Sequence, residues 1–113
     1  MKTYRYCFAL DLINDDELIS AYKKHHQKVW PEIVESITDS GILNLEIYLV
    51  ENRLFMIMDV NESFSFDKKT KNDANNPTVQ EWESLMWKYQ QALPTAKEGE
   101  KWLLMEKIYH LKA

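Results

Sequence analysis

A tyrosine and a histidine four residues apart are the side chains best suited to acid–base chemistry. Tyr22 and His26 lie in the segment YKKHHQKVWP, which runs from residue 22 to residue 31. Residues four apart share one face of a helix, and both of these side chains carry transferable protons. Histidine titrates near neutral pH, so it can act as acid or base with little tuning. The pair indicates a proton-transfer site.

The adjacent histidine complicates this assignment. His25 lies about 100° further round a helix than His26, so one small pocket is not expected to hold both. Spacing alone does not choose between them. The alternative is a hydrogen-bonded core histidine beside a solvated one, which is the commoner state of histidines on helices. A metal site is not favoured, because adjacent histidines rarely converge on one ion and His110 is distant in the chain.

Aromatic residues in the second half suggest a pocket wall. Trp82 and Tyr89 fit a helical stripe of apolar residues and are predicted to be core. Trp87 falls off that stripe, so it is the better candidate for the wall. Asn44 and Glu46 alternate with apolar residues. They either face inward, where they could bind a ligand's hydroxyl groups, or face water, and the sequence leaves both possibilities open.

Apolar periodicity predicts the elements that position these residues. A break around Trp30 is expected because Pro31 cannot continue a helix, and Pro31 can open a second helical segment. Glu51 and Asn52 form the turn of a predicted hairpin. The predicted strands span residues 3–12, 42–50, 54–60 and 102–111. The predicted helices span about 15–29, 31–37, 64–71 and 77–93.

The order of these elements is β-α-β-β-α-β, the arrangement of ferredoxin-like α+β domains. Such a domain has an antiparallel sheet with its helices on one face. The 113 residues fit a single domain that spans the chain. The opposite face of the sheet needs a cover, and a second copy of the chain is the simplest one. We therefore predict a homodimer.

Composition limits the other partners. The net charge is −4, and the Lys and Arg residues are scattered, so nucleic acid is an unfavourable partner. The two glycines, Gly41 and Gly99, do not form a phosphate-binding loop. Cys7 is the single cysteine, which suits a reducing cytosol. The apolar runs are too short for a signal peptide or a membrane span, so we expect a cytoplasmic protein without a membrane partner.

The first motif resembles that of a known family. Tyr22, His26 and the run Trp30-Pro31-Glu32 match the Y-x-x-x-H-x-x-x-W-P-E signature of L-rhamnose mutarotases. The similarity covers nearly the whole chain and continues through Asn44, Ile47-Tyr48-Leu49, Met86-Trp87-Lys88-Tyr89 and Pro94.

The resemblance implies a dimeric ferredoxin-like isomerase that interconverts the α and β anomers of a 6-deoxyhexose. No cofactor or metal is implied. His26, and not His25, matches the family's proton donor. Tyr22 matches a substrate-binding tyrosine, and Trp87 matches the second of two adjacent substrate-contacting tryptophans.

Two positions depart from the family pattern. Met86 stands where rhamnose enzymes carry the first of those tryptophans, and Leu45 stands where they carry a substrate-contacting tyrosine. Both replacements would reshape the substrate-binding pocket, so the sugar is either L-rhamnose or another 6-deoxyhexose such as L-fucose. A cofactor-free monooxygenase, a heme-handling protein and a non-catalytic sugar sensor remain as alternatives, because one fold hosts several functions.

Overall fold

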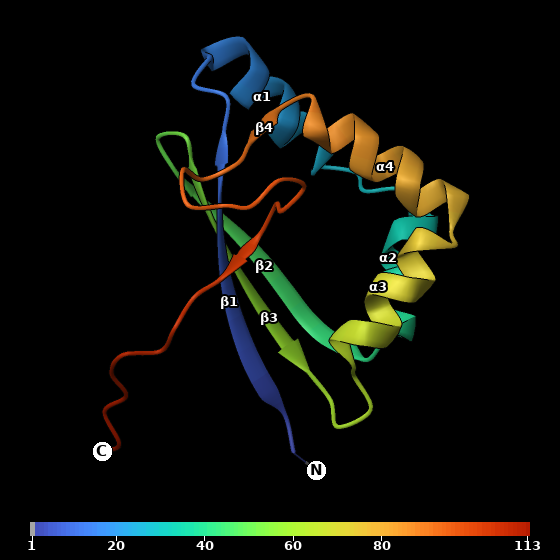
Figure 1. The fold of residues 1–113 in the computed structure, drawn as a ribbon, viewed down its shortest axis with the longest axis vertical. Coiled ribbons are helices and arrows are strands. Elements are labelled where there is room, and N and C mark those ends of the chain that lie inside the picture. Colours follow the sequence, from blue (N-terminus) through green and yellow to red (C-terminus); the bar gives the residue numbers. More distant parts are fainter. Residues whose placement is uncertain (1) are drawn as a thin grey trace.

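The computed structural model describes residues 2–113 as an antiparallel sheet with its helices on one face (Figure 1). The strand order is β2-β3-β1-β4, and β5 also pairs with β1. This is the predicted ferredoxin-like α+β class. The elements in chain order are β1 (Tyr4–Leu12), α1 (Asp16–His25), α2 (Pro31–Asp39), β2 (Ile42–Val50), β3 (Arg53–Val60), α3 (Phe66–Ala74), α4 (Pro77–Trp87), β4 (Gln90–Gln91) and β5 (Leu103–Leu104).

Alternation along the strands sets the face that the helices cover. Phe8 pairs with Met56 and Leu10 pairs with Leu54, so apolar side chains from β1 and β3 share the inner face. The predicted alternation fails at one point on β2. A bulge between Ile42 and Asn44 buries Ile42 and leaves Leu43 55% exposed, although alternation along residues 42–50 places Leu43 on the same face as Leu45.

The first helix is shorter than predicted. It begins after Asp15, whose side chain accepts a hydrogen bond from the Leu18 amide at 3.0 Å, and it ends at His25 rather than near Val29. The residue before a proline is held in an extended conformation, and Trp30 has φ −57° and ψ 136°. The helix must therefore end before Trp30, and α2 starts at Pro31 as predicted.

The C-terminal third departs most from the expected elements. Helix α4 ends at Trp87 instead of Leu93, because Gln90 and Gln91 leave the helix and pair with β1. The final strand is β5 alone and not the whole of residues 102–111. After the Met105 amide donates to the Cys7 carbonyl at 2.7 Å, residues 106–113 have no regular secondary structure.

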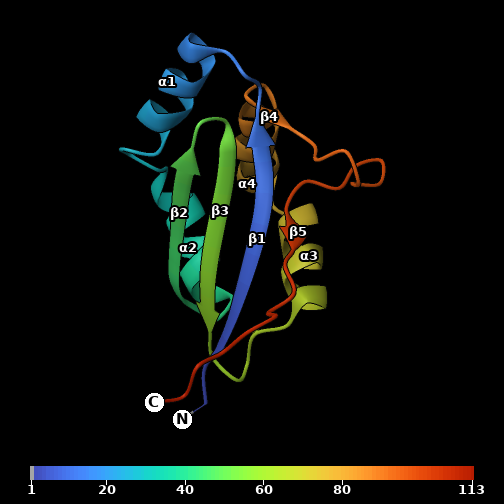
Figure 2. The same cartoon turned by 90° about the vertical axis from the view of Figure 1, so that its left-hand side faces the viewer.

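The second face of the sheet carries no helix within residues 2–113 (Figure 2). An ion pair joins Arg5 to Asp59 at 2.7 Å, and the Asn44 side chain donates to Asp59 and to Glu46. Tyr48 on the same face is 53% exposed. Asn44 and Glu46 therefore belong to the outer face, which answers the question that the sequence left open. No helix among the described residues is long and apolar enough to cross a bilayer.

Candidate active site

A cavity of about 240 Å³ lies between the inner face of the sheet and the helices. It is bounded by residues from α1, α2, α3, α4, β2 and β3. Most of its lining is apolar, and a small group of polar side chains enters it. Tyr22 on α1, His26 at the C-terminal cap of α1 and Gln90 on β4 form a polar group in this lining. Apolar pockets with a few converging polar groups are typical of small-molecule sites.

His26 is fixed by its main-chain neighbour. It caps α1, and its Nδ1 lies 2.9 Å from the Tyr22 carbonyl oxygen. A carbonyl can only accept, so Nδ1 carries the proton and Nε2 is the acceptor of the neutral ring. Burial lowers the pKa of His26 below its usual 6.5, although the bond to Tyr22 opposes this effect. His26 is therefore mainly neutral at pH 7, with Nε2 able to take up a proton.

Tyr22 lies directly against this ring. It is 4% exposed, and its ring centroid is 4.4 Å from that of His26. Burial raises the pKa of the Tyr22 hydroxyl above its usual 10, so the hydroxyl stays protonated at physiological pH. The site thus holds a neutral base and a neutral acid side by side, which is the arrangement that moves protons without building net charge.

The structure separates the two histidines that the spacing left equivalent. His25 does not line the cavity, and its Nε2 lies 3.1 Å from the Tyr89 hydroxyl. The two rings pack with their centroids 5.4 Å apart. His25 therefore helps to hold the segment after α4 against α1, whereas His26 faces the cavity.

Trp82 and Trp102 line the cavity, whereas Trp87 does not. Trp82 is 8% exposed and packs edge-on against His26, with centroids 5.7 Å apart, and against Trp30 at 5.1 Å. Trp87 is 38% exposed and holds the Lys101 Nζ 4.9 Å from its ring centroid, outside this cavity. The stripe that faces inward along α4 is Val79, Trp82 and Met86, and Trp87 lies about 100° away from it.

Leu45 and Met86, the two departures from the family pattern, both line the cavity. Leu45 comes from β2 on the sheet, and Met86 is 3% exposed on α4. Their side chains are apolar where rhamnose enzymes are expected to carry aromatic ones. At these two positions, one in each layer, the cavity wall is therefore apolar without being aromatic.

Gln90 is a functional candidate that the sequence did not indicate. It is 7% exposed, lines the cavity, and donates from Nε2 to the Tyr22 hydroxyl oxygen at 3.2 Å. Its Oε1 is buried and has no hydrogen-bond partner within residues 2–113. Leaving such a group unpaired costs about 1–3 kcal/mol. A glutamine in a polar stretch predicts an exposed residue, and only the early end of α4 turns it inward.

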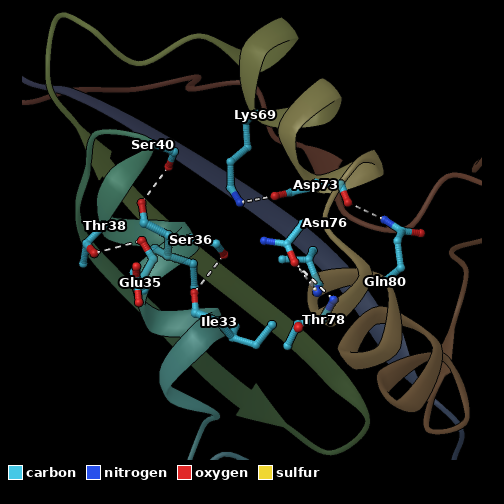
Figure 3. A network of polar contacts seen from close by, with 12 residues as sticks. Ile33, Glu35, Ser36, Thr38, Ser40, Lys69, Asp73, Asn76, Thr78 and Gln80 are labelled. Carbon is cyan, nitrogen blue, oxygen red and sulfur yellow. Dashed lines mark hydrogen bonds and ion pairs between the residues drawn. The ribbon is translucent and has the colours of Figure 1, made fainter.

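A second polar part of the cavity lies where α3 meets the start of α4. Lys69 and Asp73 of α3 form an ion pair of 2.7 Å there (Figure 3). The Asp73 carbonyl accepts from the Gln80 side chain at 2.8 Å, and this bond joins α3 to α4. No group of three His, Cys, Asp or Glu residues within residues 2–113 is arranged to hold a metal ion.

The protein is of the ferredoxin-like α+β class, with a tyrosine and a histidine packed together in the lining of a largely apolar cavity. The sequence profile of the family described as L-rhamnose mutarotase matches residues 5–111. The chain belongs to this family, whose members are isomerases that interconvert sugar anomers.

Individual relatives carry two different sugar names. An L-fucose mutarotase of Xanthomonas campestris is 42% identical over 113 residues, which cover 98% of this chain and 90% of that protein. An L-rhamnose mutarotase of Listeria monocytogenes is 34% identical over 70 residues, 60% of each chain. The crystal structure of an L-rhamnose mutarotase from Formosa agariphila superposes with a TM-score of 0.71, covers 96% of this chain and 99% of its own, and is 23% identical. That likeness concerns the fold.

Proposed function

We propose that the protein interconverts the α and β anomers of a 6-deoxyhexose, with L-fucose as the preferred sugar and His26 as the proton-exchanging residue. The observation that carries the proposal is the cavity-facing His26, whose Nδ1 is occupied by the Tyr22 carbonyl at 2.9 Å. That bond leaves Nε2 to exchange protons with a bound sugar.

Each half of the reaction takes one proton from the sugar and gives one proton to it. Ring opening breaks the bond between C1 and the ring oxygen while a proton leaves the anomeric hydroxyl and another arrives at the ring oxygen. Closure on the other face of C1 reverses both transfers. Neutral His26 takes the proton of the anomeric hydroxyl on Nε2, while the Tyr22 hydroxyl gives its proton to the ring oxygen. On closure the protonated His26 returns a proton to the oxygen on C1, and Tyr22 recovers its proton from the ring oxygen. No electron or group is transferred, so the proposed reaction requires no cofactor.

The preference for L-fucose rests on the walls of the cavity and on the relatives. Leu45 and Met86 replace the aromatic residues expected in rhamnose enzymes, and both lie in the cavity wall. The relative named for L-fucose is 42% identical over 98% of this chain, whereas the Listeria relative named for L-rhamnose is 34% identical over 60% of it. The apolar lining also suits the methyl group at C6 of a 6-deoxy sugar.

Anomer exchange measured with and without the protein tests this proposal. L-Fucose, L-rhamnose and L-galactose are compared at equal concentration by saturation-transfer NMR. We expect the largest acceleration for L-fucose. L-Galactose should respond least, because it carries a C6 hydroxyl in place of the methyl. Binding of these sugars without acceleration would instead indicate a sugar sensor, and no response to any of them would contradict the proposal.

We also propose that the protein is a homodimer, with the outer face of the sheet and the C-terminal segment against the second copy. Val50 on that face is 68% exposed, and Ile108, Tyr109 and Leu111 are 88%, 75% and 71% exposed. Exposed apolar groups of this kind mark protein interfaces. Light scattering should give twice the 13.5 kDa of one chain. The mass of a single chain at micromolar concentration would contradict this proposal.

A further inference from the structure

Gln90 occupies the first position of β4, directly after α4 ends. It pairs with Leu12 of β1, and its side chain is buried on the face of the sheet that the helices cover. Gln91 pairs with Asp11, and because successive strand residues face opposite sides, its side chain is exposed. The chain therefore provides two adjacent glutamines in one strand, one within the cavity lining and one outside it.

The hydrogen bond from Gln90 determines where the Tyr22 proton can go. The Gln90 Nε2 donates to the Tyr22 hydroxyl oxygen at 3.2 Å, so Gln90 does not use the hydroxyl's own proton. That proton is then available to an acceptor in the cavity that Tyr22 and His26 line. Without a neighbouring donor of this kind, nothing would fix the direction in which a tyrosine hydroxyl donates its proton.

The second polar atom of the same carboxamide is unpaired. Gln90 Oε1 is buried without a hydrogen-bond partner among residues 2–113, and Gln90 is 7% exposed. Buried polar groups in native proteins nearly always have partners, so an exception calls for a functional explanation. A sugar presents several hydroxyl donors and would enter the cavity beside this oxygen.

We propose that Gln90 is a positioning and specificity residue for the anomer exchange. It directs the Tyr22 hydroxyl proton to the sugar, and a small rotation of its carboxamide lets Oε1 accept a hydrogen bond from a sugar hydroxyl. This inference rests on the proposed mutarotase function and adds a residue to its site. It predicts that Gln90 acts through Tyr22 and on sugar binding, and not through the stability of β4.

Three variants test the proposal. Gln90→Met keeps the length of the side chain and removes both polar atoms, and we expect kcat/KM for L-fucose to fall about tenfold, with a change in KM as well as in kcat. Gln91→Met is the matched control and should exchange anomers at the wild-type rate. A Gln90→Met enzyme with wild-type kcat and KM would overturn the proposal.

Gln90→Glu distinguishes a role of Gln90 in positioning the Tyr22 proton from a purely structural role. It also tests the proposal if Gln90→Met does not fold. The ionised carboxylate of this variant only accepts, so it takes the Tyr22 hydroxyl proton away from the sugar. Once protonated, the carboxylic acid can again donate to Tyr22. The ratio of the variant's rate to the wild-type rate should therefore rise as the pH falls. His26, Tyr22 and Glu83, the other titratable groups at this end of the cavity, are common to both proteins.

A ratio that is constant with pH would show that Gln90 serves structure alone. The wild-type rate distinguishes the two possible failures. If the wild-type protein does not accelerate exchange, the proposed function fails. If it does accelerate exchange and the Gln90 variants match it, only this inference fails. Quenching of tryptophan fluorescence by L-fucose follows binding separately from exchange, because Trp82 lies in the cavity wall.

Discussion

The Tyr22 carbonyl oxygen accepts a hydrogen bond from His26 Nδ1 at 2.9 Å, while the hydroxyl of the same tyrosine lies in the cavity that His26 faces. In the proposed reaction, Tyr22 thus sets the tautomer of the base with its main chain and supplies the acid with its side chain. The same carbonyl oxygen also accepts the backbone amide of His26 at 3.3 Å, so it contacts both the main chain and the ring of His26 at the end of α1.

The pH dependence of the exchange should follow His26. Burial lowers its pKa, so His26 stays neutral to a lower pH than a solvated histidine does. The reacting complex needs neutral His26 with an uncharged sugar. Thus kcat/KM should be constant near neutral pH and should fall as the pH drops through the pKa of His26, with a midpoint below 6.5. Saturation-transfer rates between about pH 4.5 and 8 measure it. A midpoint above that of a solvated histidine would contradict the neutral, buried state of His26.

Removal of the Tyr22 hydroxyl should slow the exchange without unfolding the protein. In Tyr22→Phe the ring still packs against His26, but the hydroxyl that Gln90 contacts at 3.2 Å is lost. We expect a decrease of about tenfold or more in kcat/KM. Tyr89→Phe is the control, because it removes the hydroxyl that contacts His25 outside the cavity. Equal rates for the two variants would exclude a role for the Tyr22 hydroxyl.

The identity of the cavity wall should control the choice of sugar. Leu45→Tyr and Met86→Trp restore the residues that the resemblance to rhamnose enzymes implies, and both positions line the cavity. We expect the double variant to raise the ratio of kcat/KM for L-rhamnose to that for L-fucose by about tenfold. Trp87→Leu serves as the comparison, because Trp87 lies outside this cavity. An unchanged ratio in the double variant would mean that other residues select the sugar.

Helix α4 carries Trp82 and Met86 into the cavity, and its first turn depends on one cap. The Asn76 side chain accepts from the amides of Thr78 at 3.1 Å and Val79 at 3.3 Å (Figure 3). Asn76→Ala should lower the free energy of unfolding by about 1 kcal/mol. Asn72→Ala, in the exposed face of α3, should be neutral or slightly stabilising. Urea denaturation of both variants measures the difference, and an equal effect would rule out the capping role.

The sequence was sufficient for the features that local chemistry determines. The alternation of apolar residues predicted β1, and the turn at Glu51 and Asn52 predicted the hairpin of β2 and β3. Pro31 placed the start of α2. Tyr22 and His26 lie together as their spacing of four predicts, although His26 caps the helix instead of continuing it. These features depend on residues close together in the chain.

The sequence was not sufficient for features that depend on contacts between residues far apart in the chain. Pairing with β1 ends α4 early and brings Gln90 inward. The final strand pairs with β1 only at Leu103 and Leu104. Trp87 was expected in the pocket wall because it lies off the helical stripe. Trp82 occupies that wall instead, since the stripe itself faces the cavity. The choice between His25 and His26 likewise depended on Tyr89, which lies 64 residues along the chain from His25.

The most direct test of the proposed site compares His26→Ala with His25→Ala in the anomer exchange of L-fucose, measured by saturation-transfer NMR. We predict a decrease of about 10²-fold or more for His26→Ala, because proton exchange with the sugar is lost. His25→Ala should stay close to the wild-type rate, since His25 contacts Tyr89 and not the cavity. An unchanged rate in a folded His26→Ala protein would contradict the assignment of the catalytic residue.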